Sequence, residues 1–179
     1  MNTGLISRRY AKALYEYASK RKMENVLYAR MQTLVREINA IPKLKTILRS
    51  PMIPTVYKKD LLAEASGANP EPVYLDFVRL VTENHREEMV FDIAMNYQIL
   101  YRQRKNISVV SLISAEPMSA EALSRIKNRV QQKTHGEVEF STVIDRSIDG
   151  GFIFQLEDMR LDASVKGQLE KIRRKLNSL

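Results

Sequence analysis

The stretch "IAMNYQILYRQRKNISVVSLIS", residues 93–114, decides the fold because the spacing of its apolar residues changes at Asn106. Before Asn106, Ile93 and Tyr97 continue the 3.6-residue repeat of an amphipathic helix. After it, "ISVVSLIS" is β-branched and apolar on both faces, which is typical of a buried central strand. The sequence therefore predicts a two-domain α+β protein whose boundary lies next to Lys105.

Helical spacing dominates the chain on the N-terminal side of this boundary. In the first predicted helix, Tyr10, Ala13, Leu14 and Tyr17 fall at i, i+3, i+4 and i+7, so they share one face. Proline and glycine divide the segments that follow into short helices joined by turns. We expect residues 1–105 to form a six-helix bundle.

On the C-terminal side, predicted strands alternate with predicted helices. The segment "EALSRIKNRVQQKTHG" has helical spacing, whereas "EVEFSTVI" and "GFIFQLE" alternate as strands do. The first two strands should be parallel through a right-handed crossover, with the third returning as a hairpin arm. Asp162 is expected to cap the last helix. We therefore expect residues 106–179 to form a small β-α-β-β-α domain.

Composition and charge narrow the possible functions. The chain has no Cys, which excludes disulfides, thiolate zinc sites and cysteine nucleophiles. No stretch approaches the roughly 20 apolar residues that span a bilayer, and we expect no targeting segment. Residues 1–105 carry 18 Lys and Arg against 11 Asp and Glu, whereas residues 106–179 carry 11 against 10. The helical half should therefore attract an acidic partner, with nucleic acid, anionic lipid and an acidic protein all open.

The stretch "IDRSIDGGFIFQLEDMRLDASV", residues 144–165, invites a phosphate-loop or metal-site interpretation. A phosphate loop places its glycines before a helix N-terminus, but Gly150 and Gly151 precede a predicted strand, so we expect them to shape a turn. The acids of the stretch lack the spacing of a calcium loop and suit turns and caps, so we predict no metal or cofactor site. These acids are Asp145, Asp149, Asp158 and Asp162.

No catalytic group is predicted. His85 and His135 lie far apart in the sequence, and neither an HExxH nor a Ser-His-Asp pattern accompanies them. The densest basic run falls in the last turn of a predicted helix, where cations suit the helix dipole and solvent. It comprises Lys171, Arg173, Arg174 and Lys175.

The first helix carries more apolar and aromatic side chains than one buried face needs. Tyr10, Tyr15 and Tyr17 crowd residues 10–18 together with three alanines and one leucine. Some of these side chains can therefore stay exposed after the bundle forms. Core packing and a groove for a partner helix are both open on this observation.

Four motifs resemble one protein family. They are "RRYAKALYEYA" at residues 8–18, "VTENHRE" at 81–87, "SAEPMSAEAL" at 114–123 and "IDRSIDGGFIFQLEDMRLDASVKGQL" at 144–169. In this order they resemble the delta subunit of F-type ATP synthase, whose mitochondrial counterpart is the oligomycin-sensitivity-conferring protein. The resemblance covers essentially the whole chain, and its last motif is the most specific.

The resemblance implies a peripheral-stalk, or stator, function without catalysis or a cofactor. Such subunits join the catalytic head to the stalk, so that the head does not rotate with the rotor. By this resemblance, residues 1–105 bind N-terminal helices of alpha subunits between the first and fifth helices. Residues 106–179 hold the C-terminal end of the b-type stalk subunit. The implied groove residues are Tyr10, Ala13, Leu14, Tyr17, Phe77, Leu80 and Val81.

The last motif departs from the family pattern at two points. Asp149 stands where the family usually has an apolar residue before the glycine pair. The sequence "LED" at residues 156–158 replaces the usual "IGD". Both departures bear on the shape of that turn and on its contact with the stalk.

Two other functions compete with this interpretation. The basic helical half is compatible with a nucleic-acid-binding adaptor, whose affinity would fall steeply with salt. An enzyme using Asp145 or His135 is disfavoured because no nucleophile, base and orienting group occur together. The resemblance instead implies no nucleic-acid partner. Together with the expected lack of a presequence, it favours a bacterial protein held peripherally at the cytoplasmic face of the inner membrane.

Overall fold

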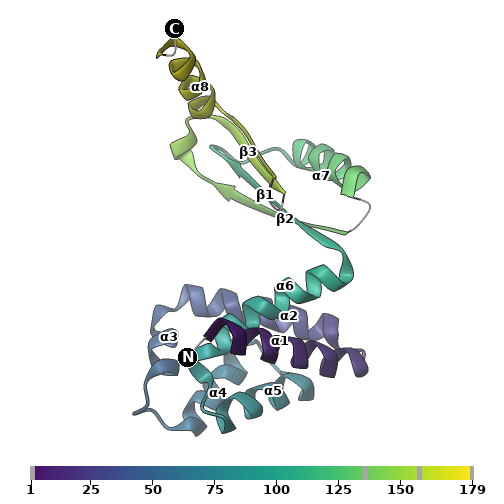
Figure 1. The fold of residues 1–179 in the computed structure, drawn as a ribbon, viewed down its shortest axis with the longest axis vertical. Helices are drawn as coiled ribbons and strands as arrows, with labels where there is room; N and C mark the ends of the chain where they lie inside the picture. Colours follow the sequence, from purple (N-terminus) through teal and green to yellow (C-terminus); the bar gives the residue numbers. More distant parts are fainter. Residues whose placement is uncertain (1–2, 135–136, 157–158, 178–179) are drawn as a thin grey trace. The chain divides into compact units, whose positions relative to one another are not determined.

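The computed structural model describes residues 3–134, 137–156 and 159–177. The chain divides into two compact units, Met1–Arg104 and Lys105–Leu179. The first unit is helical, and the second contains a four-stranded mixed sheet with helices (Figure 1). The predicted α+β class is therefore confirmed.

The helical unit is built from helices joined by short turns. Pro42 and Pro72 each occupy the first turn of a helix, where a missing backbone N–H costs nothing. A short 3₁₀ turn precedes the last helix of the unit, which the spacing of apolar residues did not predict. The elements are α1 (Thr3–Lys20), α2 (Glu24–Ala40), α3 (Pro42–Arg49), α4 (Thr55–Ala65), α5 (Pro72–Glu83), η1 (Glu87–Met89) and α6 (Val90–Lys105).

Helix α2 supplies the centre of the core in this unit. Leu27, Met31, Leu34 and Ile38 recur on one face of α2, and each is at most 1% exposed. Removing such a side chain from water stabilises the fold by about 1.5–3 kcal/mol before conformational entropy is counted. Helices α5 and α6 pack fully buried side chains of their own into the same unit.

Buried polar side chains of α5 and α6 donate hydrogen bonds to the backbone of other helices. The hydroxyl of Tyr74 donates to the carbonyl of Leu62 at 2.7 Å, and Nε2 of Gln98 donates to the carbonyl of Met31 at 3.1 Å. Burial raises the pKa of the Tyr74 phenol well above its ordinary value, so this donor keeps its proton. These bonds satisfy groups that would otherwise be costly to bury.

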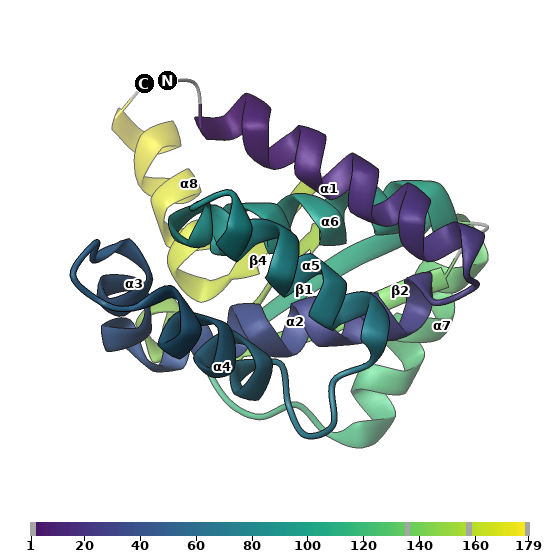
Figure 2. The same cartoon turned by 90° about the horizontal axis from the view of Figure 1, so that it is seen from below.

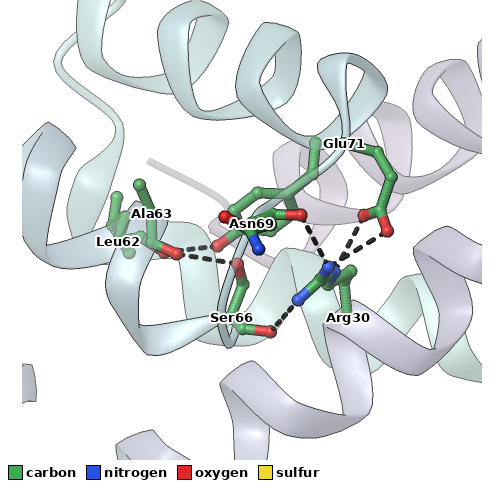
Figure 3. A network of polar contacts seen from close by, with 7 residues as sticks. Arg30, Leu62, Ala63, Ser66, Asn69 and Glu71 are labelled. Atoms are coloured by element: carbon green, nitrogen blue, oxygen red, sulfur yellow. Dashed lines mark hydrogen bonds and ion pairs between the residues drawn. The ribbon is translucent and has the colours of Figure 1, made fainter.

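Arg30 of α2 holds the loop that connects α4 to α5 (Figure 3). Its Nε donates to Oε2 of Glu71 at 2.8 Å and its Nη2 to Oε1 at 3.0 Å, which makes a bidentate ion pair. The same guanidinium donates to the carbonyls of Ser66 and Asn69 at 3.1 and 2.9 Å. Gly67 has φ +102°, and a Cβ there would approach Arg30 to 3.0 Å. The loop is thus shaped around one side chain.

The second unit is organised around a sheet with the order β2-β1-β3-β4. β1 and β2 are parallel, with Val110 opposite Phe140, and β1 pairs with β3 in the antiparallel sense, with Leu112 opposite Phe154. Central strand β1 is buried at Val110 and Leu112, as its apolar sequence predicts. The elements are β1 (Ile107–Ser114), α7 (Ala120–Thr134), β2 (Glu137–Ile144), η2 (Arg146–Ile148), β3 (Gly151–Leu156), β4 (Met159–Ser164) and α8 (Val165–Asn177).

Two parts of the predicted β-α-β-β-α order are wrong. A fourth strand, β4, follows β3, and β3 pairs with β1 and β4 rather than with β2. The hairpin is therefore β3–β4. Asp162, which the sequence predicts as a helix cap, lies opposite Ile153 inside β4, so the chain is extended where a helix start is expected. Short edge strands with charged residues are common, since charge discourages pairing with other chains.

Gly150, Gly151 and Asp162 meet at the corner between β4 and α8, where the carbonyl of Gly150 accepts from the backbone N–H of Val165 at 3.0 Å. Gly151 has φ +73°, and a Cβ there would lie 2.3 Å from the carbonyl oxygen of Ala163, so only glycine fits. The cap of α8 is Ser164, whose Oγ accepts from the backbone N–H of Gly167 at 3.0 Å. Oδ1 of Asp162 accepts from the backbone N–H of Ser164 at 3.0 Å and so holds the capping residue. Asp162 therefore supports the cap without being it.

We predict that Arg30→Met lowers the free energy of unfolding by about 2–3 kcal/mol, because it removes charge-assisted hydrogen bonds from a partly buried site. Urea denaturation followed by circular dichroism measures this change. Arg36→Met is the matched control on α2, since the Arg36–Glu37 pair is exposed and spans 3.4 Å. Equal effects of the two substitutions would contradict the role given to Arg30.

The same pair makes stability depend on pH. The hydrogen bonds from Arg30 hold the pKa of the Glu71 carboxyl below its ordinary value. A lowered native pKa contributes stability above the unfolded pKa and loses it as pH falls. We therefore expect the stability gap between wild type and Arg30→Met to shrink between about pH 5 and pH 3. A gap that stays constant across this range in urea titrations would refute the assignment.

Candidate docking groove

A groove of about 1000 Å³ lies between α1 and α5 of the helical unit. The two helices lie side by side in both views of the molecule (Figures 1 and 2). The hydroxyl of Tyr17 on α1 donates to Oδ2 of Asp76 on α5 at 2.5 Å, so the walls are joined directly. The groove is thus a feature of the folded helical unit alone.

Six of the seven residues that the resemblance implies for a groove line this one. Leu14 and Phe77 lie deep in the groove, at 8% and 3% exposure, while Leu80 stands 47% exposed at its side. Apolar side chains therefore form both the base and part of the wall. The predicted residues that line the groove are Tyr10, Ala13, Leu14, Tyr17, Phe77 and Leu80.

Val81 is the exception. It is fully buried in the core of the helical unit and does not line the groove. Val81 follows Phe77 by four residues, which rotates it about 40° around α5. This rotation turns Val81 inward, and Leu80 takes the position facing the groove.

One end of the groove has a polar bridge. Asp76 accepts from Tyr17 and also from Nη2 of Arg79 at 3.0 Å. The guanidinium of Arg21 lies 3.7 Å from the centre of the Tyr17 ring. The hydrogen bond to Asp76 raises the pKa of the Tyr17 phenol above its ordinary value. The bridge therefore joins α1 to α5 with its donor protonated at neutral pH.

The groove also has a polar rim, which the apolar stripes of the sequence do not indicate. Its charged residues border the same face at helical spacing. Arg9 stands four positions before Ala13, and Glu83 stands three after Leu80. The additional lining residues include Ile6, Arg9, Asp76, Arg79, Glu83 and Arg86.

This arrangement suits binding and gives no sign of catalysis. An apolar trough between two helices with a charged rim is the shape that accepts an amphipathic helix. His85 is exposed in the turn after α5, with φ +51°, and His135 lies outside the described residues. Across the described residues, no group of three or more His, Cys, Asp or Glu could hold a metal ion.

Asp145 and Asp149 belong to the turn between β2 and β3, at the two ends of η2. Oδ1 of Asp145 accepts from the backbone N–H of Ser147 at 2.9 Å, and hydrogen bonding from Ser147 lowers the pKa of Asp145. Asp149 adopts a left-handed conformation with φ +60° at the turn before the glycines. Asp158 and most of the "LED" departure lie outside the described residues.

The C-terminal unit exposes apolar side chains on β4 and α8. Met159 and Leu161 of β4 are 71% and 59% exposed and lie opposite Leu156 and Phe154 on one face of the sheet. Val165 and Leu169 are exposed one turn apart on α8. We call these four the β4–α8 surface. In the basic run, Arg173 and Arg174 are exposed, and the side chains of Lys171 and Lys175 lie outside the described part.

No described helix has the length and apolar character that crossing a membrane requires.

Comparison with a solved structure supports the architecture. Over 95% of this chain and 96% of the other, the fold matches a chain in the mitochondrial ATP synthase hexamer of Toxoplasma gondii, with a TM-score of 0.73 and 19% sequence identity. This likeness shows that the two chains share one fold, in which the helical unit and the mixed sheet occur together.

The sequence comparisons then identify the family. The family model described as ATP synthase delta (OSCP) subunit matches residues 6–176. The ATP synthase subunit delta of Phocaeicola vulgatus is 41% identical over 97% of this chain and 94% of its own length. That of Bacteroides thetaiotaomicron is 38% identical with the same coverage. The chain belongs to the ATP synthase delta (OSCP) subunit family, as the motifs predicted. The alternative of a nucleic-acid-binding adaptor finds no support in these comparisons.

Proposed function

We propose that this chain joins the catalytic head of a proton-translocating ATP synthase to its peripheral stalk, so that the head does not rotate with the rotor. The observation that carries the proposal is the α1–α5 groove in a chain of the delta (OSCP) family. In this function the chain is a structural subunit and performs no chemistry itself.

The partner proposed for the groove is an amphipathic N-terminal helix of an alpha subunit. Its apolar face would cover Leu14, Phe77 and Leu80 and remove them from water. Three arginines border the groove against two carboxylates, those of Asp76 and Glu83, so its lining carries one net positive charge. The surplus positive charge favours a helix with acidic residues flanking its apolar stripe.

The partner proposed for the second unit, residues 106–179, is the C-terminal end of the b-type stalk subunit. The β4–α8 surface supports this assignment because large apolar side chains are exposed there on adjoining elements. Arg173 and Arg174 are exposed on the same helix and can pair with acidic residues of a stalk helix. Residues 1–105 would thus serve the head, and residues 106–179 the stalk.

Two attachments in one chain suit a mechanical load. A linked pair of binding sites holds more tightly than either site alone, because release of one leaves the other to recapture the partner. Torque from the rotor is then resisted by buried surface at both ends of the chain. The bacterial relatives lead us to propose a peripheral position at the cytoplasmic face of the inner membrane.

We predict that Ala13→Trp weakens binding to the catalytic head by at least about tenfold, because an indole would fill the groove. Isothermal titration of the full chain with a peptide from the N-terminus of the cognate alpha subunit measures the loss. Ala29→Trp is the matched control, since Ala29 is exposed on α2 and does not line the groove. Unchanged binding by Ala13→Trp would place the partner elsewhere.

We predict that Leu161→Asp weakens binding of the purified stalk subunit while binding of the alpha peptide stays unchanged. The carboxylate would have to be desolvated at an apolar contact, and about a tenfold loss of affinity is expected. Gln155→Asp is the control, because Gln155 is exposed on β3 and lies on the opposite face of the sheet from Leu161. Loss of both partners by Leu161→Asp would indicate misfolding, which circular dichroism would detect.

A further inference from the structure

Helix α1 borders a second groove on its other flank. This groove, of about 340 Å³, separates α1 from α6 and lies wholly within the helical unit. Lys12, Glu16 and Lys20 of α1 line one side, while Leu100 and Arg104 of α6 line the other. None of the residues that line the α1–α5 groove takes part in it.

The charges of the second groove form a regular pattern. Lys12, Glu16 and Lys20 follow one another at four-residue spacing, so their signs alternate along one stripe of α1. Arg104 adds a third positive charge from α6. All four side chains are exposed, and no ion pair within the described part of the chain engages them.

The base of this groove is fixed by aromatic packing. The ring of Tyr15 lies 6.0 Å from that of Tyr97 and 6.5 Å from that of Tyr101, both of which are buried. Tyr101 in turn stacks on Tyr28 at 4.0 Å. Contacts of this kind hold the rings in defined orientations. The charged stripe is therefore displayed on a rigid support.

We propose that the α1–α6 groove binds an acidic helical segment of another protein chain. The segment that complements α1 carries an acid, a base and an acid at positions i, i+4 and i+8, opposite Lys12, Glu16 and Lys20. A membrane or a nucleic acid offers negative charge throughout and would set phosphates against Glu16. A protein helix can place a cation there, which is why a protein segment fits best.

The test uses the full chain labelled with ¹⁵N and an alanine-based helical peptide carrying Glu, Lys and Glu at i, i+4 and i+8. Saturable shifts of backbone amides in α1 and α6 are expected. The control is a peptide of identical composition that carries Glu at i and i+4 and Lys at i+8. It should bind more weakly. Equal affinity of the two peptides, no shifts at all, or shifts confined to α5 would each overturn the proposal.

Protein variants separate this pattern from net charge. Lys12→Glu with Lys20→Glu should weaken binding by about tenfold, because both glutamates of the peptide would then face a negative charge on α1. Lys43→Glu with Lys59→Glu makes the same change in net charge on α3 and α4 and should have little effect. Equal losses of affinity in the two variants would mean that net charge alone drives binding, and would overturn the proposal.

Two further measurements test the location of the site and the class of partner. Ala13→Trp obstructs the α1–α5 groove and should leave peptide binding unchanged, so failure of the proposed function and failure of this inference remain distinguishable. Vesicles of phosphatidylglycerol should not reproduce the amide shifts. Identical shifts with vesicles would assign the groove to an anionic lipid surface and overturn the assignment to a protein segment.

Discussion

The bidentate ion pair between Arg30 and Glu71 is the constraint on which the docking surfaces of the helical unit depend. Glu71 immediately precedes α5, so the guanidinium fixes where that helix begins. Arg30 stands on α2, whose other face forms the centre of the core. The ion pair therefore fixes the position of α5, and with it one wall of the α1–α5 groove, relative to α2. Walls held by the core keep the shape of the groove, because a wall carried on a free loop would yield.

The two units expose their apolar side chains in different ways. The helical unit exposes a trough between packed helices and keeps charges at its rim. The C-terminal unit relies on a short hairpin whose last strand passes directly into a capped helix, with Gly151 at a place where the backbones approach too closely for a side chain. Both arrangements present apolar surface on rigid elements, which is a suitable basis for attachment without chemistry.

The spacing of apolar residues predicted the helices and strands whose residues alternate between the core and solvent. It failed where local hydrogen bonds decide whether a segment is a strand or the start of a helix. The helical spacing of α1 located Tyr10 and Leu14 because each lies on a continuous stripe. Val81 lies in the core and not in the groove, because one residue on a helix turns a side chain through about 100°, and a stripe as wide as that of α5 does not mark its own edge. The sequence does not predict β4, because aspartate is a common N-cap residue and Asp162 stands just before a helix. The residue that caps α8 is Ser164, and only the structure identifies it. The pairing of β3 with β1 depends on contacts distant in sequence, which local patterns do not encode.

The groove between α1 and α5 also has a consequence for the order in which the protein is made. Its two walls meet through Tyr17 and Asp76, which are 59 residues apart in the chain. The ribosome releases the first wall long before the second, and the clamp from Arg30 cannot close until Glu71 has emerged as well. Since domains fold as units during synthesis, a nascent chain has no competent groove until most of the helical unit has left the exit tunnel. The groove therefore exists only in chains whose helical unit has already folded.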